Sequence, residues 1–168
     1  MNTYETILKR RSIRKYKDQS ITDEQIDIIL KAAMASPSAR NAQPWEFYVI
    51  KNKEVQTKIK MIAKNYDFNS DLMIVVCGNK TRTITKNDND FFIQDVSAAT
   101  ENILLTCCEL GLGTVWCGIF PVEERTTLMK NVLNLSEEII PVALIHIGYP
   151  DEEKEPRHQY KEEYVHFI

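Results

Sequence analysis

The chain has 168 residues, 43% of them apolar, and a formal net charge of −3 at neutral pH. This length suits one domain with an ordinary hydrophobic core. A mildly acidic protein lacks the broad positive face of general nucleic-acid or membrane-surface binders. Because no apolar run is long enough to span a bilayer and no signal-peptide stretch opens the chain, we expect a cytoplasmic protein that binds neither nucleic acid nor membrane.

Positive charge is concentrated near the start of the chain. A short helix predicted over Thr3–Arg10 leads into residues 9–17, which hold six basic side chains and no acidic one. If a helix or turn continues there, Arg10 and Arg14 lie on one side because they are four residues apart. Arginine binds phosphate through a planar fork of donors, and Ser12 adds a hydroxyl. A solvated charged stretch without a ligand is the alternative.

A second predicted helix is followed by a polar loop. Thr22 and Gln25 have the spacing of a capping box at its start, and Pro37 prevents it from continuing. The loop over residues 36–44 offers hydroxyl and amide groups that can read a polar ring edge or a sugar-like chain. These side chains are Ser38, Asn41 and Gln43. A capped helix exit leading into a strand over Trp45–Lys51 is an equally good interpretation of the loop.

The remaining segments alternate between helix and strand patterns. The predicted helices cover Lys53–Lys64, Phe91–Leu110 and Glu123–Leu133, the predicted strands cover Leu72–Cys77, Thr114–Ile119 and Val142–Tyr149, and Asn79–Asn89 is predicted to be a loop. The helix over Phe91–Leu110 is apolar on most sides, which is typical of a central helix buried by several neighbours or by a partner subunit. The mixture predicts an α+β fold with a small sheet enclosed by helices.

Common catalytic and metal-binding patterns are missing from the sequence. The cysteines lack CxxC spacing and lie among apolar neighbours, so we interpret them as buried free thiols. The glycines of Gly111–Gly118 close a helix and open a strand, the reverse of a dinucleotide-binding fingerprint. His146 lies in an apolar strand and is interpreted as a packed or interface histidine rather than a ligand. Phosphate and polar-ring binding without a nucleophile or an acid–base pair indicates a bound cofactor that carries the chemistry.

Four motifs, in this order, resemble the nitroreductase family of FMN-dependent oxidoreductases. They are RRSIR at 10–14, SPSARNAQPW at 36–45, GLGTVWCG at 111–118 and IGYP at 147–150, with Arg157 beyond them. The resemblance spans essentially the whole chain. It implies a three-layer α/β/α sandwich with a small, mainly antiparallel sheet. Residues 1–168 would form one FMN-binding domain, in which 151–168 are a C-terminal arm that docks on the partner subunit.

The resemblance also implies a set of cofactor-binding residues. They are Arg10, Arg11, Ser12, Arg14, Pro37, Ser38, Ala39, Asn41, Asn69, Cys117, Gly118, Ile119 and Arg157. The first three and Arg157 would hold the FMN phosphate and its chain, and Arg14 would stabilise the reduced flavin electrostatically. The residues from Pro37 to Asn41 would come from the partner subunit. The backbone of 117–119 would lie beside flavin N5.

The activity implied by the resemblance is a ping-pong NAD(P)H oxidoreductase reaction. NADH or NADPH gives a hydride to flavin N5, and an electron-poor acceptor such as a nitroaromatic compound or a quinone then takes the electrons. The enzyme would be a homodimer with FMN at the interface, without a metal or a catalytic side chain. Two alternatives stay open: a non-catalytic module that binds, stores or senses FMN, and a family branch that dehalogenates a substrate or rearranges flavin. The sequence does not identify the acceptor or the preferred nucleotide.

Overall fold

The computed structural model describes residues 2–86, 89–155 and 157–168. The helices are α1 (Thr3–Lys9), α2 (Asp23–Met34), α3 (Lys53–Lys60), α4 (Phe92–Glu109) and α5 (Glu123–Leu133). The strands are β1 (Trp45–Ile50), β2 (Leu72–Asn79), β3 (Thr85–Lys86), β4 (Asn89–Asp90), β5 (Gly113–Gly118) and β6 (Ile139–Gly148). Short 3-10 helices cover Ala39–Asn41, Lys64–Tyr66 and Glu162–Tyr164.

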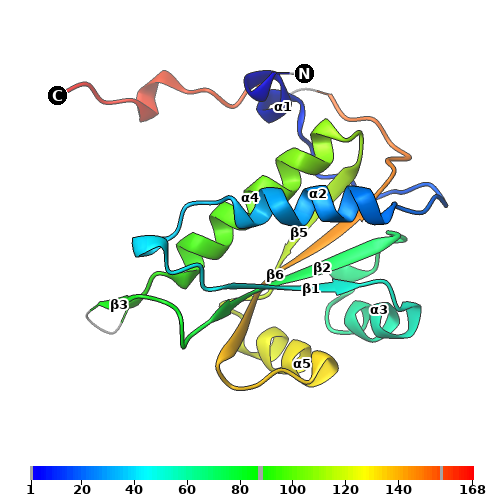
Figure 1. Cartoon of the computed structure of the whole chain (residues 1–168). Coiled ribbons are helices and arrows are strands. Elements are labelled where there is room, and N and C mark those ends of the chain that lie inside the picture. Colours follow the sequence, from blue (N-terminus) through cyan, green and yellow to red (C-terminus); the bar gives the residue numbers. More distant parts are fainter. Residues whose placement is uncertain (1, 87–88, 156) are drawn as a thin grey trace.

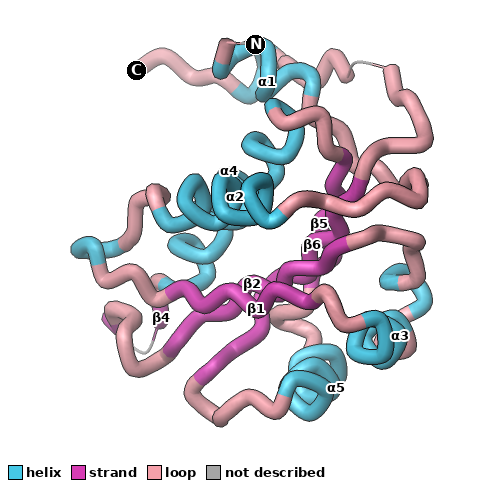
Figure 2. The backbone as a smooth tube through the Cα atoms, turned by 45° about the vertical axis from the view of Figure 1, so that its right-hand side comes forward, coloured by secondary structure: helices cyan, strands magenta, loops and turns pink. Residues whose placement is uncertain are grey.

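A four-stranded antiparallel sheet forms the middle layer, with strand order β1-β2-β6-β5. Helices α2 and α4 cover one face of it, while α3 and α5 cover the other (Figure 1). The tube view shows the same separation of helices above and below the sheet (Figure 2). The predicted α+β sandwich with a small antiparallel sheet is confirmed.

Both faces of the sheet are buried, because helices cover each of them. Successive side chains of a strand point to opposite sides, so each central strand contributes to both cores. In β2, Ile74 packs in the core beneath α2 and α4, whereas Met73 and Val75 pack in the core shared with α3 and α5. The central strands therefore contain nearly continuous apolar runs, as strands covered on both faces do.

Local sequence signals explain most helix boundaries. Asn2 and Thr22 form capping boxes at the starts of α1 and α2. Gly111, predicted from the sequence to close a helix, follows α4 with a φ of 75°, the left-handed conformation that commonly ends a helix. The short helix predicted over Thr3–Arg10 ends at Lys9, and the chain does not continue as a helix through Arg10–Arg14. Instead, Ser12 pairs in parallel with Thr114 of β5, so tertiary pairing replaces the next helical turn.

Other differences from the predicted elements are small. Helix α3 ends at Lys60, and β6 begins earlier than expected, at Ile139. The predicted loop over 79–89 contains the short paired strands β3 and β4, while residues 87–88 lie outside the described part of the chain. Among the described residues, no helix combines the length and apolar character that crossing a membrane requires.

The C-terminal arm is largely uncovered by the rest of the chain. It passes beside α1 and then extends away from the sheet layers (Figure 1). Residues 157–168 are all exposed, including the aromatic side chains of Tyr160, Tyr164 and Phe167. The arm contributes little to the hydrophobic core of its own chain.

Candidate functional site

The basic segment that follows α1 is held against the edge of β5. The backbone N–H of Ile13 donates to the carbonyl of Thr114 at 2.8 Å, and the Ile13 side chain is buried against Gly113. A Cβ at Gly113 would lie 2.8 Å from two Ile13 carbon atoms, so only glycine allows this close approach. The sheet therefore fixes the backbone on which the predicted phosphate-binding side chains stand.

Four of the predicted phosphate-binding residues line one cavity of about 260 Å³. Arg10, Arg11 and Ser12 reach it from the basic segment, and Arg157 reaches it from the C-terminal arm. Glu101 of α4 also lines the cavity, and its Oε1 lies 3.6 Å from Arg10 Nε. Three guanidinium groups and one carboxylate therefore line the cavity, so its net charge is positive, which suits the binding of a phosphate ester.

Hydrogen bonds to backbone carbonyls orient the Arg11 side chain in this cavity. Arg11 Nε donates to the carbonyl of Glu155 at 2.9 Å, which joins the basic segment to the arm. The Arg11 guanidinium also donates to the carbonyl of Leu8 at 2.7 Å. Arg157 has no ion pair with any of the described residues, so its charge is available for a ligand.

The chain beyond Ser12 is fixed by side chains from distant segments. Asn69 accepts from the Tyr16 N–H at 3.3 Å and donates to the Tyr16 carbonyl at 2.7 Å. The Glu152 carboxylate accepts the backbone N–H groups of Arg14 and Lys15, and the first of these bonds is the main reason that its pKa is lowered. Asn69 thus positions the basic segment, and its predicted contact with flavin stays a prediction.

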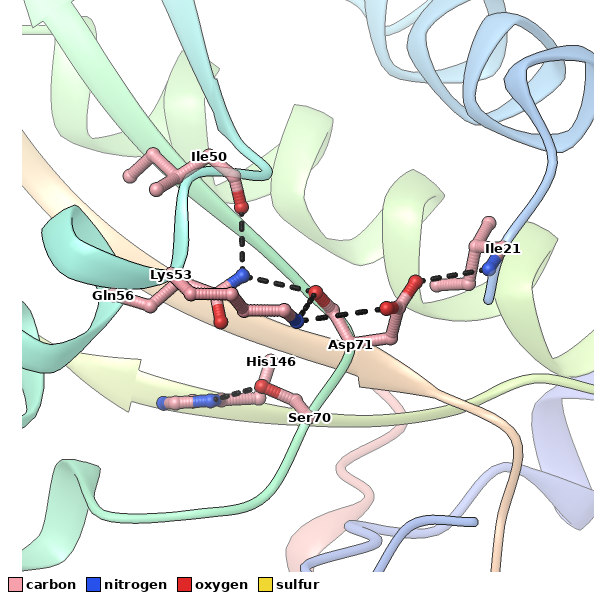
Figure 3. A network of polar contacts seen from close by, with 7 residues as sticks. All are labelled: Ile21, Ile50, Lys53, Gln56, Ser70, Asp71 and His146. Atoms are coloured by element: carbon pink, nitrogen blue, oxygen red, sulfur yellow. Dashed lines mark hydrogen bonds and ion pairs between the residues drawn. The ribbon is translucent and has the colours of Figure 1, made fainter. Parts of the chain in front are cut away.

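The segment that carries Tyr66 and Asn69 is itself anchored by a polar network (Figure 3). Ser70 Oγ lies 2.8 Å from Nδ1 of the buried His146, whose pKa burial lowers to about 4. The Asp71 carboxylate accepts the Ile21 N–H, and Gln56 donates to the Asp71 carbonyl. His146 is therefore a packed histidine, as the sequence suggested.

The end of β5 is held by two donors on one carbonyl. Tyr66 Oη donates to the Gly118 carbonyl at 2.7 Å, and Arg125 Nη1 donates to the same oxygen at 3.0 Å. The Arg125 guanidinium also lies over the Tyr66 ring, 5.5 Å from its centroid. A Cβ at Gly118 would meet no atom within 4 Å, so the backbone faces open space on that side.

Arg14 lies near the same end of β5. Burial raises the pKa of the Cys117 thiol to about 11, while the charges of Arg14 and Arg125 oppose this rise. The side chain of Ile119 is buried, and its backbone N–H donates to the Val142 carbonyl at 3.0 Å. The open side of Gly118 and the arginines beside Cys117 thus form the accessible part of the predicted 117–119 site.

The predicted segment from Pro37 to Asn41 lies elsewhere in the chain. It follows α2 near the start of α4, whereas the basic segment lies near the other end of α4 (Figures 1 and 2). Asp95 of α4 accepts the Ala39 N–H at 2.9 Å, and Ser38 Oγ accepts the Gln43 N–H at 3.0 Å. The structure therefore does not bring Ser38, Ala39 and Asn41 to the cavity within one chain.

This loop has an unusual backbone. Arg40, Asn41 and Gln43 have φ values of 52°, 55° and 49°, in the left-handed region that side chains other than glycine rarely adopt. Such conformations persist only where surrounding contacts impose them, and they concentrate at functional sites. The Asp95 contact is one such constraint on the loop.

Sequence reasoning missed several residues that shape the site. Tyr66 lies three residues before the predicted site residue Asn69, and Asp95 is an acidic residue in a mostly apolar helix. Both positions therefore carried a weak sequence signal of a functional role. Arg125 stands among polar residues of an ordinary surface helix and left none. Glu152 was hidden among the many charges of the arm.

Comparison with known proteins decides the family. The model of the Nitroreductase family matches residues 7–65 and 64–149. The chain belongs to the nitroreductase family. An Archaeoglobus fulgidus member named "Putative NADH dehydrogenase/NAD(P)H nitroreductase" is 43% identical over 154 residues, covering 89% of this chain and 86% of the relative.

Solved structures of nitroreductase-family proteins share the fold. An FMN-dependent nitroreductase from Clostridium difficile R20291 is 32% identical with a TM-score of 0.87, covering 96% of each chain. A Desulfovibrio desulfuricans protein named "putative nitroreductase", solved in complex with FMN, is 25% identical with a TM-score of 0.85, covering 98% of this chain and 95% of the other. The resemblance inferred from the sequence is confirmed, and the names of these relatives agree with the predicted enzyme class and cofactors.

Proposed function

We propose that this nitroreductase-family protein is a homodimeric FMN-dependent NAD(P)H oxidoreductase. In this proposal NADH or NADPH and an electron-poor acceptor, such as a nitroaromatic compound or a quinone, react in turn at one cleft. The observation that carries it is the cavity in which Arg10, Arg11 and Ser12 meet Arg157 from the far end of the chain. This donor set has the chemistry of a phosphate site.

The residues present fit FMN on two further counts. Arg157, which has no ion pair with the residues that the structure describes, supplies a cation at the cavity. The open side of Gly118 leaves room for a flat ring against the backbone. When bound, FMN supplies the centre that accepts and donates hydride, and for that reason the protein needs no nucleophile. Arg10, Arg11, Ser12 and Arg157 would hold its phosphate, and Cys117 and Gly118 would line its ring.

Arg14 is assigned an electrostatic role. Its side chain is exposed, it has no ion pair with the described residues, and its charge acts on Cys117. A positive charge there favours the anionic reduced form of a bound flavin. Its backbone position is fixed by Glu152 and, through Tyr16, by Asn69.

We infer the dimer from two features of the single chain: a predicted site segment that lies away from the cavity, and apolar side chains that are exposed. The left-handed loop over Ala39–Asn41 lies away from the phosphate cavity, so a second copy would bring it to the site. Apolar side chains of α1 and the arm are exposed, and a partner subunit would cover them. The main examples are Tyr4, Ile7, Leu8, Tyr160, Tyr164 and Phe167. The cofactor would then lie between the two copies.

Spectroscopy of the purified protein tests the proposal. We expect a yellow protein that releases FMN on denaturation and is bleached by NADH or NADPH under anaerobic conditions. Arg157→Ala should weaken FMN binding about tenfold, as expected for a charge-assisted phosphate contact at an exposed site. Lys161→Ala, on the same arm but outside the cavity, is the control. A colourless protein that cannot be reconstituted with FMN contradicts the proposal.

Turnover separates the enzyme from a flavin-storage or flavin-sensing module. Steady-state oxidation of NAD(P)H with a quinone or nitroaromatic acceptor should give parallel double-reciprocal lines, the pattern of a ping-pong reaction. A protein that binds FMN but shows almost no turnover would instead support the module. Light scattering during size-exclusion chromatography would establish whether the FMN-loaded protein is a dimer.

A further inference from the structure

The Arg125 guanidinium lies at the end of β5, where it contacts Gly118 and has further donors that a substrate could use. Arg125 stands in the first turn of α5, and its guanidinium is held by the Gly118 carbonyl and the Tyr66 ring. Its donors serve the Gly118 carbonyl and the Tyr66 hydroxyl, whereas a guanidinium has five N–H groups. The remaining donors are free to bind another group.

The charge of Arg125 is not neutralised locally. Among the described residues, no carboxylate lies within 4.0 Å of its guanidinium. Asp67, the acid next to Tyr66, is paired with Lys60 at 3.5 Å, and Glu152 near Arg14 is paired with Lys154 at 3.3 Å. The end of β5 is therefore flanked by two arginines, Arg14 and Arg125, that make no ion pair within the described part of the chain.

We propose that Arg125 is a specificity-determining residue that favours electron acceptors bearing an anionic group such as a carboxylate. This inference rests on the proposed function, because it places the acceptor on the open side of Gly118. Arg14 is assigned to the cofactor, so Arg125 is the cation left for the second molecule. The Arg125 guanidinium is fixed by the Tyr66 ring and by its hydrogen bond to Gly118 before a ligand binds. This preorganisation reduces the conformational entropy that is lost on binding.

The same cation also suits a phosphate of the nucleotide donor, and the experiment separates these two sources. It uses the full FMN-loaded protein with two acceptors of similar shape, the anion 4-nitrobenzoate and the neutral 4-nitrobenzamide. The measured quantity is the ratio of their kcat/KM values within each variant, so that a general loss of activity cancels. The kcat/KM values for NADH and NADPH are measured in parallel.

Matched variants isolate the charge. Arg125→Gln should lower the benzoate-to-benzamide ratio about tenfold, as expected for loss of a partly exposed charge-assisted hydrogen bond. Arg125→Lys keeps the charge and should lower the ratio much less. Tyr66→Phe removes the hydroxyl that contacts Gly118 and Arg125 but keeps the ring beneath the guanidinium, so the ratio should fall less than in Arg125→Gln. Lys58→Gln removes an exposed positive charge from α3 and controls for net charge.

Binding without turnover gives a second readout. The oxidised holoprotein is titrated calorimetrically with 4-nitrobenzoate and with 4-nitrobenzamide. Arg125→Gln should weaken the binding of 4-nitrobenzoate and leave the binding of 4-nitrobenzamide unchanged. An unchanged ratio and unchanged benzoate affinity would overturn the proposal, as would an equal loss for both acceptors. A loss confined to NADH and NADPH would assign the cation to the nucleotide and make the acceptor assignment wrong.

Failure of the proposed function would look different. In that case NAD(P)H would not bleach the wild-type protein, and neither acceptor would turn over. Selective benzoate binding by wild type and its loss in Arg125→Gln would still support Arg125 as an anion-binding residue. No difference between benzoate and benzamide would contradict it.

Discussion

Replacing Gly113 with alanine would test how the phosphate-binding segment is supported. An added Cβ would lie 2.8 Å from Cβ and Cγ2 of Ile13 and 2.9 Å from Cγ1, whereas ordinary contacts begin at 3.4 Å. Ile13 would have to retreat by 3.4 − 2.8 = 0.6 Å. Overpacking of this kind costs about 1–3 kcal/mol. For a domain of this size each kcal/mol lowers Tm by about 2–4 °C, so we expect a loss of about 2–12 °C.

Thermal unfolding of the FMN-free protein, followed by circular dichroism, measures this loss. Gly118→Ala is the matched control, because its Cβ meets no atom within 4 Å and should leave Tm of the FMN-free protein unchanged. In a fluorescence titration Gly113→Ala should also weaken FMN binding, since Ile13 stands between Ser12 and Arg14. A Tm equal to that of the wild type would refute the argument that Ile13 is tightly packed on β5.

Three further predictions concern charge, assembly and pH. Arg14→Ala should lower the midpoint potential of the bound flavin more than it weakens FMN binding; an unchanged potential in a redox titration would remove its electrostatic role. Asn41→Ala should weaken FMN binding only in a dimer, and a monomer with full FMN content would contradict the shared site. Because burial lowers the pKa of His146 to about 4 and the unfolded value is about 6.5, the unfolded state binds more protons between these values. Stability should therefore fall by up to about 3 kcal/mol as the pH drops through that window, and His146→Asn should flatten this dependence in urea denaturation.

Local sequence patterns predicted the elements but not all of their contacts. The Thr22–Gln25 capping box and the left-handed Gly111 are set by nearby residues, and both were legible from the sequence. The path of Arg10–Arg14 depends on the pairing of Ser12 with Thr114, about one hundred residues away, so the spacing of neighbouring residues could not determine it.

The candidate site shows the same division. The resemblance to the family implied that Arg10, Arg11, Ser12 and Arg157 act together, and one cavity brings these residues together. Tyr66 and Arg125 both donate hydrogen bonds to the Gly118 carbonyl, and these three residues lie in separate segments that share no sequence motif. Such contacts follow from packing of the finished fold, and they could not be predicted from the spacing of residues along the chain.

The phosphate cavity draws its cations from both ends of the chain, while the sheet and its covering helices lie between residues 23 and 148. Cofactor retention and folding are consequently separable properties. A protease that cuts the exposed arm before Arg157 would remove the proposed phosphate contact and leave the hydrophobic cores intact. Clipped molecules in a preparation would then be folded but poor in FMN, so the ratio of flavin to protein would report the integrity of the C-terminus.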